Sequence, residues 1–128
     1  MPPLALAPPI EVLLVDDQRS ILAGVAALIE SEIPFMRIVG QAVSGRQALD
    51  LACSIQPDVI VLDVDLGGED GLELIPLFRD CCDASIIVFT SFSVPEVQYR
   101  ALHLGASDFV SKTATGDALV EAIRRTVR

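Results

Sequence analysis

The chain is poor in basic residues. It has 9 lysines and arginines against 18 aspartates and glutamates, so its formal net charge is −9. Such a surface repels phosphate backbones, and we expect no direct binding of nucleic acid by this chain. The one basic cluster, Arg124, Arg125 and Arg128, falls in the last turn of a predicted helix, where cations interact favourably with the helix dipole.

Cysteine and histidine are also scarce. The 3 cysteines, Cys53, Cys81 and Cys82, are an odd number, and an adjacent pair cannot bridge without strain. Their spacing is not that of a metal site, and the single histidine, His103, adds no partner. This pattern favours reduced thiols in a cytoplasmic protein.

Long apolar runs are missing as well. No run approaches the roughly 20 residues that span a bilayer, so we expect no membrane association. The apolar start, MPPLALAPP, is short, interrupted by prolines and lacks the basic segment of a signal peptide. We interpret residues 1–9 as a loose extension. Residues 10–128, in a chain that is 52% hydrophobic, suit one domain with one core.

Apolar runs alternate with segments of helical periodicity. Strands are predicted at residues 10–15, 37–43, 58–62, 85–90 and 108–111. A helix is predicted after each strand, and capping boxes of Ser44 with Gln47 and of Ser93 with Glu96 open the second and the fourth helix. The third helix is expected near 72–81 and the fourth at 94–104, and the fifth is expected to have Asp117 in its opening turn. Residues 65–71, with three glycines, are expected to form a loop.

This strict alternation predicts a parallel sheet with helices on both faces, because parallel neighbours need crossover connections and those are right-handed. We expect a doubly wound α/β fold, a three-layer (βα)5 sandwich of five parallel strands in the flavodoxin-like order 2-1-3-4-5. In that order the first and third strands lie side by side at the centre. The ligand crevice then opens above their carboxyl ends.

Polar side chains stand where these strands end. Asp16 and Asp17 follow the first strand, Asp63 the third, Thr90 closes the fourth, and Lys112, the only lysine, follows the fifth. Parallel strands bring their carboxyl ends to one crevice, where three carboxylates would repel one another. Mg²⁺ removes that repulsion and prefers oxygen ligands. An aspartate beside such an ion can attack phosphorus, so this set suits Mg²⁺ and a phosphoryl group.

Each residue also has an ordinary explanation when it is taken alone. The pair Asp16 and Asp17 could cap a helix, since aspartate is favoured there. Asp63 could be a loop carboxylate, Thr90 a strand residue and Lys112 a solvated surface amine. Their joint occurrence at strand ends favours a functional site.

Four segments together resemble the receiver domains of two-component response regulators, which have a CheY-like fold. They are VLLVDDQ, PDVIVLDVDLGGEDGLEL, FTS and LGASDFVSK, they stand in the order of that family, and the resemblance covers residues 10–128. LGASDFVSK and the final DALVEAIRRTVR resemble the NarL type, whose receivers usually precede a helix-turn-helix DNA-binding domain.

The resemblance implies a phosphorylation site. Asp63 would accept a phosphoryl group from a sensor histidine kinase. Mg²⁺ would be held by Asp16, Asp17, Asp63 and the backbone carbonyl of Asp65. Lys112 would contact the phosphoryl group.

The resemblance also implies a switch. Thr90 would be the switch hydroxyl and Phe109 the switch aromatic, and together they would repack the face formed by the last strand and the last two helices. That face would control an effector and could serve a homodimer. Ser91 stands where the family needs a small residue, and Asp65 and Phe92 stand where side chains tune hydrolysis of the aspartyl phosphate.

Two other functions fit parts of the pattern. Asp63-Val-Asp65 also looks like the nucleophile loop of haloacid-dehalogenase-type phosphatases, but their acidic pair comes late in the chain, and Gly67 stands where they have Thr or Val. We therefore expect a signalling domain rather than an enzyme. An interaction module that needs no phosphorylation is disfavoured because all the site residues are present.

Thr113 stands where many members of the family have a proline, so the sequence leaves open whether the Lys112–Thr113 peptide is cis or trans.

Overall fold

The computed structural model describes residues 8–92 and 94–127, which form a sheet covered on both faces. Five parallel strands lie in the order β2-β1-β3-β6-β7. Their bounds are β1 Ile10–Val15, β2 Met36–Ala42, β3 Val59–Leu62, β6 Ser85–Thr90 and β7 Asp108–Ser111. Along the chain this is the order 2-1-3-4-5, so the predicted fold class is confirmed. Most of the expected N-terminal extension lies outside the described residues.

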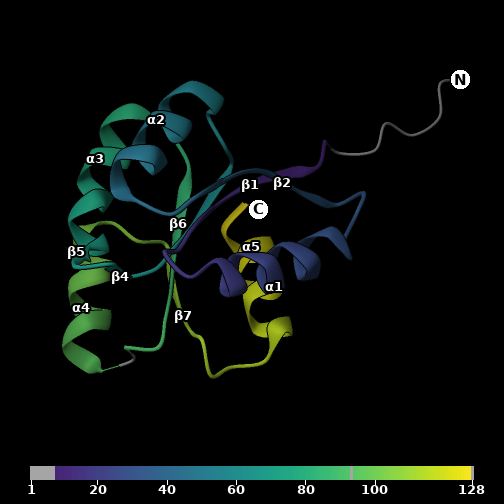
Figure 1. Ribbon diagram of the computed structural model, residues 1–128. Coiled ribbons are helices and arrows are strands. Elements are labelled where there is room, and N and C mark those ends of the chain that lie inside the picture. Colours follow the sequence, from purple (N-terminus) through teal and green to yellow (C-terminus); the bar gives the residue numbers. More distant parts are fainter. Residues whose placement is uncertain (1–7, 93, 128) are drawn as a thin grey trace, which may run out of the picture.

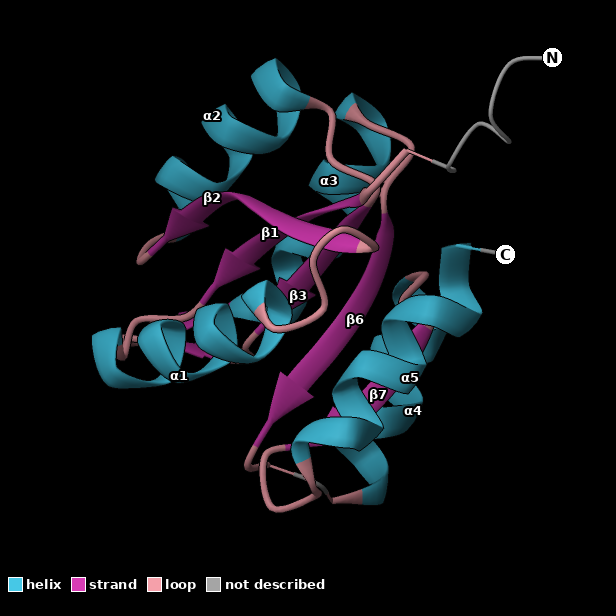
Figure 2. Ribbon diagram, turned by 90° about the vertical axis from the view of Figure 1, so that its right-hand side faces the viewer, coloured by secondary structure: helices cyan, strands magenta, loops and turns pink. Residues whose placement is uncertain are grey.

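The helices form the two outer layers (Figure 1 and Figure 2). One layer holds α1 (Arg19–Glu30) and α5 (Gly116–Val127), and the other holds α2 (Gly45–Ile55), α3 (Leu74–Cys81) and α4 (Pro95–Leu104). Among the described helices, none has the length and apolar character that crossing a bilayer requires.

The central strand β3 shows why the sheet is buried on both faces. Successive side chains of a strand point to opposite faces. Val59 and Val61 therefore join the core beneath α1 and α5, while Ile60 and Leu62 join the core beneath α2, α3 and α4. All four are buried, so the unbroken apolar run that predicted this strand follows from its place at the centre of the sheet.

The N-cap of α2 is the predicted Ser44, although the Gln47 side chain binds the Val43 amide and not that of Ser44. The Ser44 hydroxyl accepts a hydrogen bond from the Gln47 amide at 3.3 Å, and the Gln47 side chain accepts one from the Val43 amide at 2.9 Å. We expect Ser44→Ala to lower the free energy of unfolding by about 1 kcal/mol, and Ser44→Gly by only a few tenths. Urea unfolding of both variants tests this, and equal losses would show that the side-chain cap is not the cause.

The start of α4 has the predicted proline in its first turn. The N-cap of α4 is Val94, which makes no side-chain cap, and Pro95 occupies the first helical position. Ser93, the predicted cap, lies outside the described residues. Proline pre-sets the helical backbone and needs no amide partner at this position, so it favours the start of a helix there.

The segment after β3 differs from the loop predicted for residues 65–71. It contains a hairpin of β4 (Asp65–Leu66) and β5 (Glu69–Asp70), followed by a 3-10 turn, Gly71–Glu73. Gly67 and Gly68 join the two strands with φ of +64° and +98°. A two-residue turn with positive φ at both positions favours Gly-Gly, so this dipeptide was a hairpin signal that the loop prediction missed. The true α3 starts at Leu74, which leaves Pro76 in its first turn.

Side chains tie this hairpin to two helices. The Glu69 carboxylate accepts a hydrogen bond from the Gly45 amide at the start of α2, at 3.1 Å. Arg100 of α4 pairs with Asp70 at 2.6 Å. The hairpin is therefore held on both sides, beside the carboxyl end of β3.

Candidate functional site

Three polar residues of the site come directly after strands. Asp16 follows β1, Asp63 follows β3 and Lys112 follows β7. The Asp16 backbone amide donates a hydrogen bond to the last carbonyl of β2 at 3.0 Å. The Asp63 amide donates to the last carbonyl of β1 at 2.9 Å, and the Lys112 amide donates to the last carbonyl of β6 at 3.0 Å. The sheet thus fixes all three main chains, and their side chains leave from the same edge.

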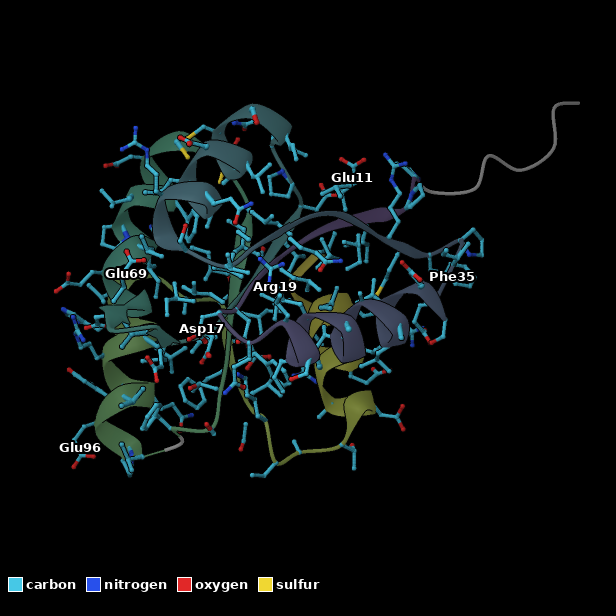
Figure 3. The ribbon with its side chains drawn as sticks, in the orientation of Figure 1. Glu11, Asp17, Arg19, Phe35, Glu69 and Glu96 are labelled. Carbon is cyan, nitrogen blue, oxygen red and sulfur yellow. The ribbon has the colours of Figure 1, made fainter. Side chains whose placement is uncertain are left out.

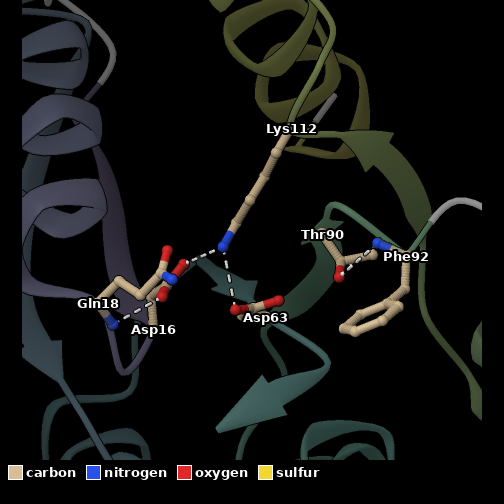
Figure 4. A network of polar contacts seen from close by, with 6 residues as sticks. All are labelled: Asp16, Gln18, Asp63, Thr90, Phe92 and Lys112. Carbon is tan, nitrogen blue, oxygen red and sulfur yellow. Dashed lines mark hydrogen bonds and ion pairs between the residues drawn. The ribbon is translucent and has the colours of Figure 1, made fainter.

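The three side chains meet in a cluster that is almost fully buried from solvent. The Lys112 ammonium lies 2.6 Å from Oδ2 of Asp16 and 3.0 Å from Oδ2 of Asp63 (Figure 4). The Lys112 side chain is 13% exposed and each carboxylate only 6%. The backbone amide of Gln18 donates to the other oxygen of Asp16 at 2.9 Å and orients this carboxylate. The Phe89 ring centroid lies 6.0 Å from the ammonium.

A third carboxylate, Asp17, lies at the mouth of this cluster. It is exposed, and oxygens of Asp16, Asp17 and Asp63 all lie within 4.8 Å of one another. One ammonium cannot balance three carboxylates, and hard oxygen donors at this spacing are what Mg²⁺ takes, usually with waters completing its shell. The residues present therefore fit a divalent cation.

The electrostatics of the cluster agree with a shortage of positive charge. Burial raises the pKa of Asp16 above its ordinary value, and the nearby Asp63 adds to this, although Lys112 and the Gln18 amide act against it. Burial alone would lower the pKa of Lys112, but its hydrogen bonds and charge interactions with the two aspartates outweigh burial and raise it. Lys112 therefore remains a protonated, positively charged ammonium.

The remaining predicted residues surround the cluster. Thr90 is fully buried at the end of β6, and its hydroxyl accepts a hydrogen bond from the Phe92 amide at 3.2 Å. Figure 4 shows Thr90 and Phe92 on the other side of Asp63 from Asp16. Ser91 is exposed, and the Phe92 side chain is half-exposed.

Two predicted residues stand outside the charged cluster. Phe109 of β7 is half-buried and packs against the core beneath α2, α3 and α4. Asp65 begins β4, and its side chain is exposed. Among the described residues the only cis peptide joins Ile33 to Pro34, so the Lys112–Thr113 peptide is trans.

Sequence reasoning missed Gly71. Its amide donates to the Val64 carbonyl at 2.6 Å, and a Cβ added to it would lie 2.1 Å from the carbonyl oxygen of Asp63. Only glycine lets these backbones approach so closely. The third glycine of the predicted loop was the available signal, but nothing local says which backbone it must approach.

Comparison with known proteins identifies this arrangement. A family model described as the response regulator receiver domain matches residues 12–124. The chain belongs to the response-regulator receiver family. The transcriptional regulatory protein LiaR of Bacillus subtilis (strain 168) is 35% identical over 116 residues, which are 90% of this chain and 54% of that protein. The chain thus spans about half the length of this curated relative.

Solved structures agree with the family. The receiver domain of the putative response regulator NarL from Mycobacterium tuberculosis has a TM-score of 0.88 and 26% identity, covering 94% of this chain and 98% of that one. A LuxR-family response regulator from Aurantimonas sp. SI85-9A1 has a TM-score of 0.86 and 30% identity, covering 93% and 85%. The predicted receiver family and its NarL-type resemblance are confirmed.

Proposed function

We propose that this receiver accepts a phosphoryl group on Asp63 from a sensor histidine kinase. The observation that carries the proposal is the Asp63 carboxylate itself, which lies at the crevice of the sheet beside the Lys112 ammonium and close to two further carboxylates. A phosphoryl donor reaches this carboxylate at the open carboxyl edge of the sheet, whereas α2 and α3 cover the sheet below it. The chain acts here as a phosphoacceptor, not as an enzyme that turns over a substrate.

Each residue of the site has its own role in phosphoryl transfer. One oxygen of Asp63 attacks phosphorus, the bond from phosphorus to the kinase histidine breaks, and the imidazole keeps the electron pair. Asp16, Asp17, Asp63 and the backbone carbonyl of Asp65 would hold Mg²⁺, which would neutralise negative charge on the phosphoryl oxygens. Lys112 moves one hydrogen bond from Asp63 to a phosphoryl oxygen. Its firm positive charge stabilises the added negative charge.

The output follows from Thr90. Its hydroxyl now accepts from the Phe92 amide, and turning it to donate to a phosphoryl oxygen would release that amide. This rotation of the Thr90 side chain also opens space into which Phe109 can rotate from β7. The added charge, about −1.5 to −2, is thus converted into a repacked face of α4, β7 and α5. We propose that this face controls an effector such as a DNA-binding domain, and that it can form a homodimer.

We also propose a cytoplasmic location, where the sensor kinase would meet the receiver. Three free cysteines are typical of a reducing compartment. The acidic surface supports the view that this receiver does not itself bind nucleic acid.

Loading with acetyl phosphate tests the function. We expect Mg²⁺-dependent addition of one phosphoryl group per chain, mapped to Asp63 by peptide mass spectrometry, and none after chelation of the metal. Asp63→Asn keeps the side-chain shape and serves as the control that accepts nothing. Continuous release of phosphate from a generic phosphate ester would support the phosphatase instead. An unmodified Asp63 would contradict the proposal.

The lifetime of the phosphoryl group tests the tuning residues. Phe92, which is 51% exposed, lies at the rim of the site, and the exposed Asp65 adds negative charge that repels hydroxide. We expect Phe92→Ala to shorten the lifetime of the aspartyl phosphate several-fold, because water gains access to phosphorus. Phe35→Ala is the matched control, since Phe35 is also exposed but lies far from Asp17 (Figure 3). Equal decay in both variants would exclude shielding by Phe92.

A further inference from the structure

Three thiols lie together at the end of the α2–α3 layer opposite the phosphorylation site. Cys53 is exposed in the last turn of α2, Cys81 ends α3 and Cys82 follows it, the last two being half-buried. The Cys81 thiol interacts with the thiols of Cys53 and Cys82. Figure 3 shows sulfur atoms, in yellow, near α2 and α3. None of the three takes part in the chemistry proposed above.

Gln56 holds the two helix ends in place. Its side-chain amide donates hydrogen bonds to the carbonyl oxygens of both Cys53 and Cys81, each at 2.9 Å. Gln56 has φ of +58°, the only positive φ of a non-glycine residue among those described, and its own amide caps α2. A side chain of this length in the left-handed region is unfavourable unless its surroundings hold it, and here the bonds to both helices do so.

The three thiols differ in what they can do. Burial, together with the neighbouring thiols of Cys53 and Cys82, raises the pKa of Cys81 to about 12, so Cys81 stays protonated. Exposed Cys53 therefore meets an oxidant first. Cys82, which follows α3, donates its S–H to the Phe78 carbonyl of that helix, and a bridge between adjacent cysteines is strained.

We propose that Cys53 and Cys81 are a site of reversible oxidation that closes a disulfide between α2 and α3 when the chain meets a peroxide. The Cys53 thiolate attacks a peroxide oxygen and becomes a sulfenic acid as water leaves. The Cys81 thiol gives up its proton to the departing hydroxide as its sulfur attacks the Cys53 sulfur, which forms the disulfide and a second water. Two thiols lose two electrons and the peroxide gains them.

The disulfide would tie together the two ends of a long segment. Residues 53–81 include β3, Asp63 and the β4–β5 hairpin, so the cross-link restricts the unfolded chain over the part that carries the acceptor. We expect the midpoint of thermal unfolding to rise by several degrees on oxidation and to fall again with dithiothreitol. Because the bond lies at the opposite edge of the sheet from Asp63, acetyl phosphate should load oxidised and reduced chains at similar rates.

Hydrogen peroxide is the probe for the test. After treatment and denaturation, thiol titration should find one free thiol in place of three, and non-reducing peptide mapping should recover a Cys53–Cys81 peptide. Cys82→Ser is the matched control that still closes the bridge, whereas Cys53→Ser and Cys81→Ser should not. Gln56→Ala should slow closure several-fold because the two helix ends are no longer joined through it.

Four other outcomes of peroxide treatment would contradict a Cys53–Cys81 disulfide. Three remaining thiols, a Cys81–Cys82 bridge, dimers linked only through Cys53, or sulfinic acid in place of a disulfide would each overturn the proposal. Asp63→Asn should oxidise like the unmodified chain. The test therefore stands apart from the proposed phosphorylation.

Discussion

Gly71→Ala should destabilise the chain and remove most of its phosphoryl acceptance. The added Cβ would lie 2.1 Å from the carbonyl oxygen of Asp63 and 3.0 Å from that of Val64. Both atoms belong to the backbone, so no side-chain rotation can relieve the clash, and the main chain that carries the acceptor must move. We expect the free energy of unfolding to fall by about 3 kcal/mol, at the upper end of overpacking costs.

Urea unfolding and the rate of loading by acetyl phosphate measure the two effects. Gly24→Ala is the matched control, because a Cβ at Gly24, inside α1, meets nothing within 4 Å. That variant should be neutral, or more stable by up to about 1 kcal/mol, and should load normally. A Gly71→Ala chain that unfolds and loads like the unmodified chain would show that the 63–71 contact has no role in positioning Asp63.

Local pattern was enough to predict the sheet and the edge at which the site lies. An apolar run such as 59–62 is nearly unambiguous when turn and helix signals flank it, and parallel connectivity then places every strand end on one edge. Asp16, Asp63 and Lys112 could be placed together because each directly follows a strand. Their mutual geometry needed only the order of the strands.

Features that depend on contacts through space were not predictable in this way. The hairpin after β3 is short and half-exposed, so its alternation is too brief to read, and only Gly67-Gly68 marked it. The distance from Gly71 to Asp63 is set by how that hairpin folds back. The cysteines show the same limit, since Cys53 meets Cys81 only because α2 packs beside α3.

Lys112→Met should make folding of the chain dependent on magnesium. Lys112 is the cation paired with both Asp16 and Asp63, and methionine keeps the apolar stem but leaves two buried carboxylates facing each other. Breaking a buried ion pair by removing one partner costs about 3–5 kcal/mol, and we expect a loss of this size near neutral pH in chelator. Mg²⁺ restores the missing positive charge, so it should recover the greater part of that loss.

The dependence on pH follows from the pKa of Asp16. Its pKa in the folded chain is already raised by burial, and losing Lys112 removes a group that lowers it. Folded chains then bind a proton that unfolded chains release, so stability is greatest below the unfolded pKa and falls as the pH rises through the folded value. The deficit of Lys112→Met without metal should therefore be small in acid and complete at neutral pH.

Unfolding with and without Mg²⁺ separates this account from a general loss of packing. The unmodified chain should gain less from Mg²⁺ than the variant does, because Lys112 already supplies part of the positive charge. Arg46→Met is the control, since Arg46 pairs with Asp50 at 3.8 Å on an open surface, and its loss should change stability by at most about 0.5 kcal/mol with no metal dependence. If Mg²⁺ stabilised the Lys112→Met chain no more than the unmodified one, repulsion between Asp16 and Asp63 would not be what the lysine relieves, and the carboxylates would not share a cation site.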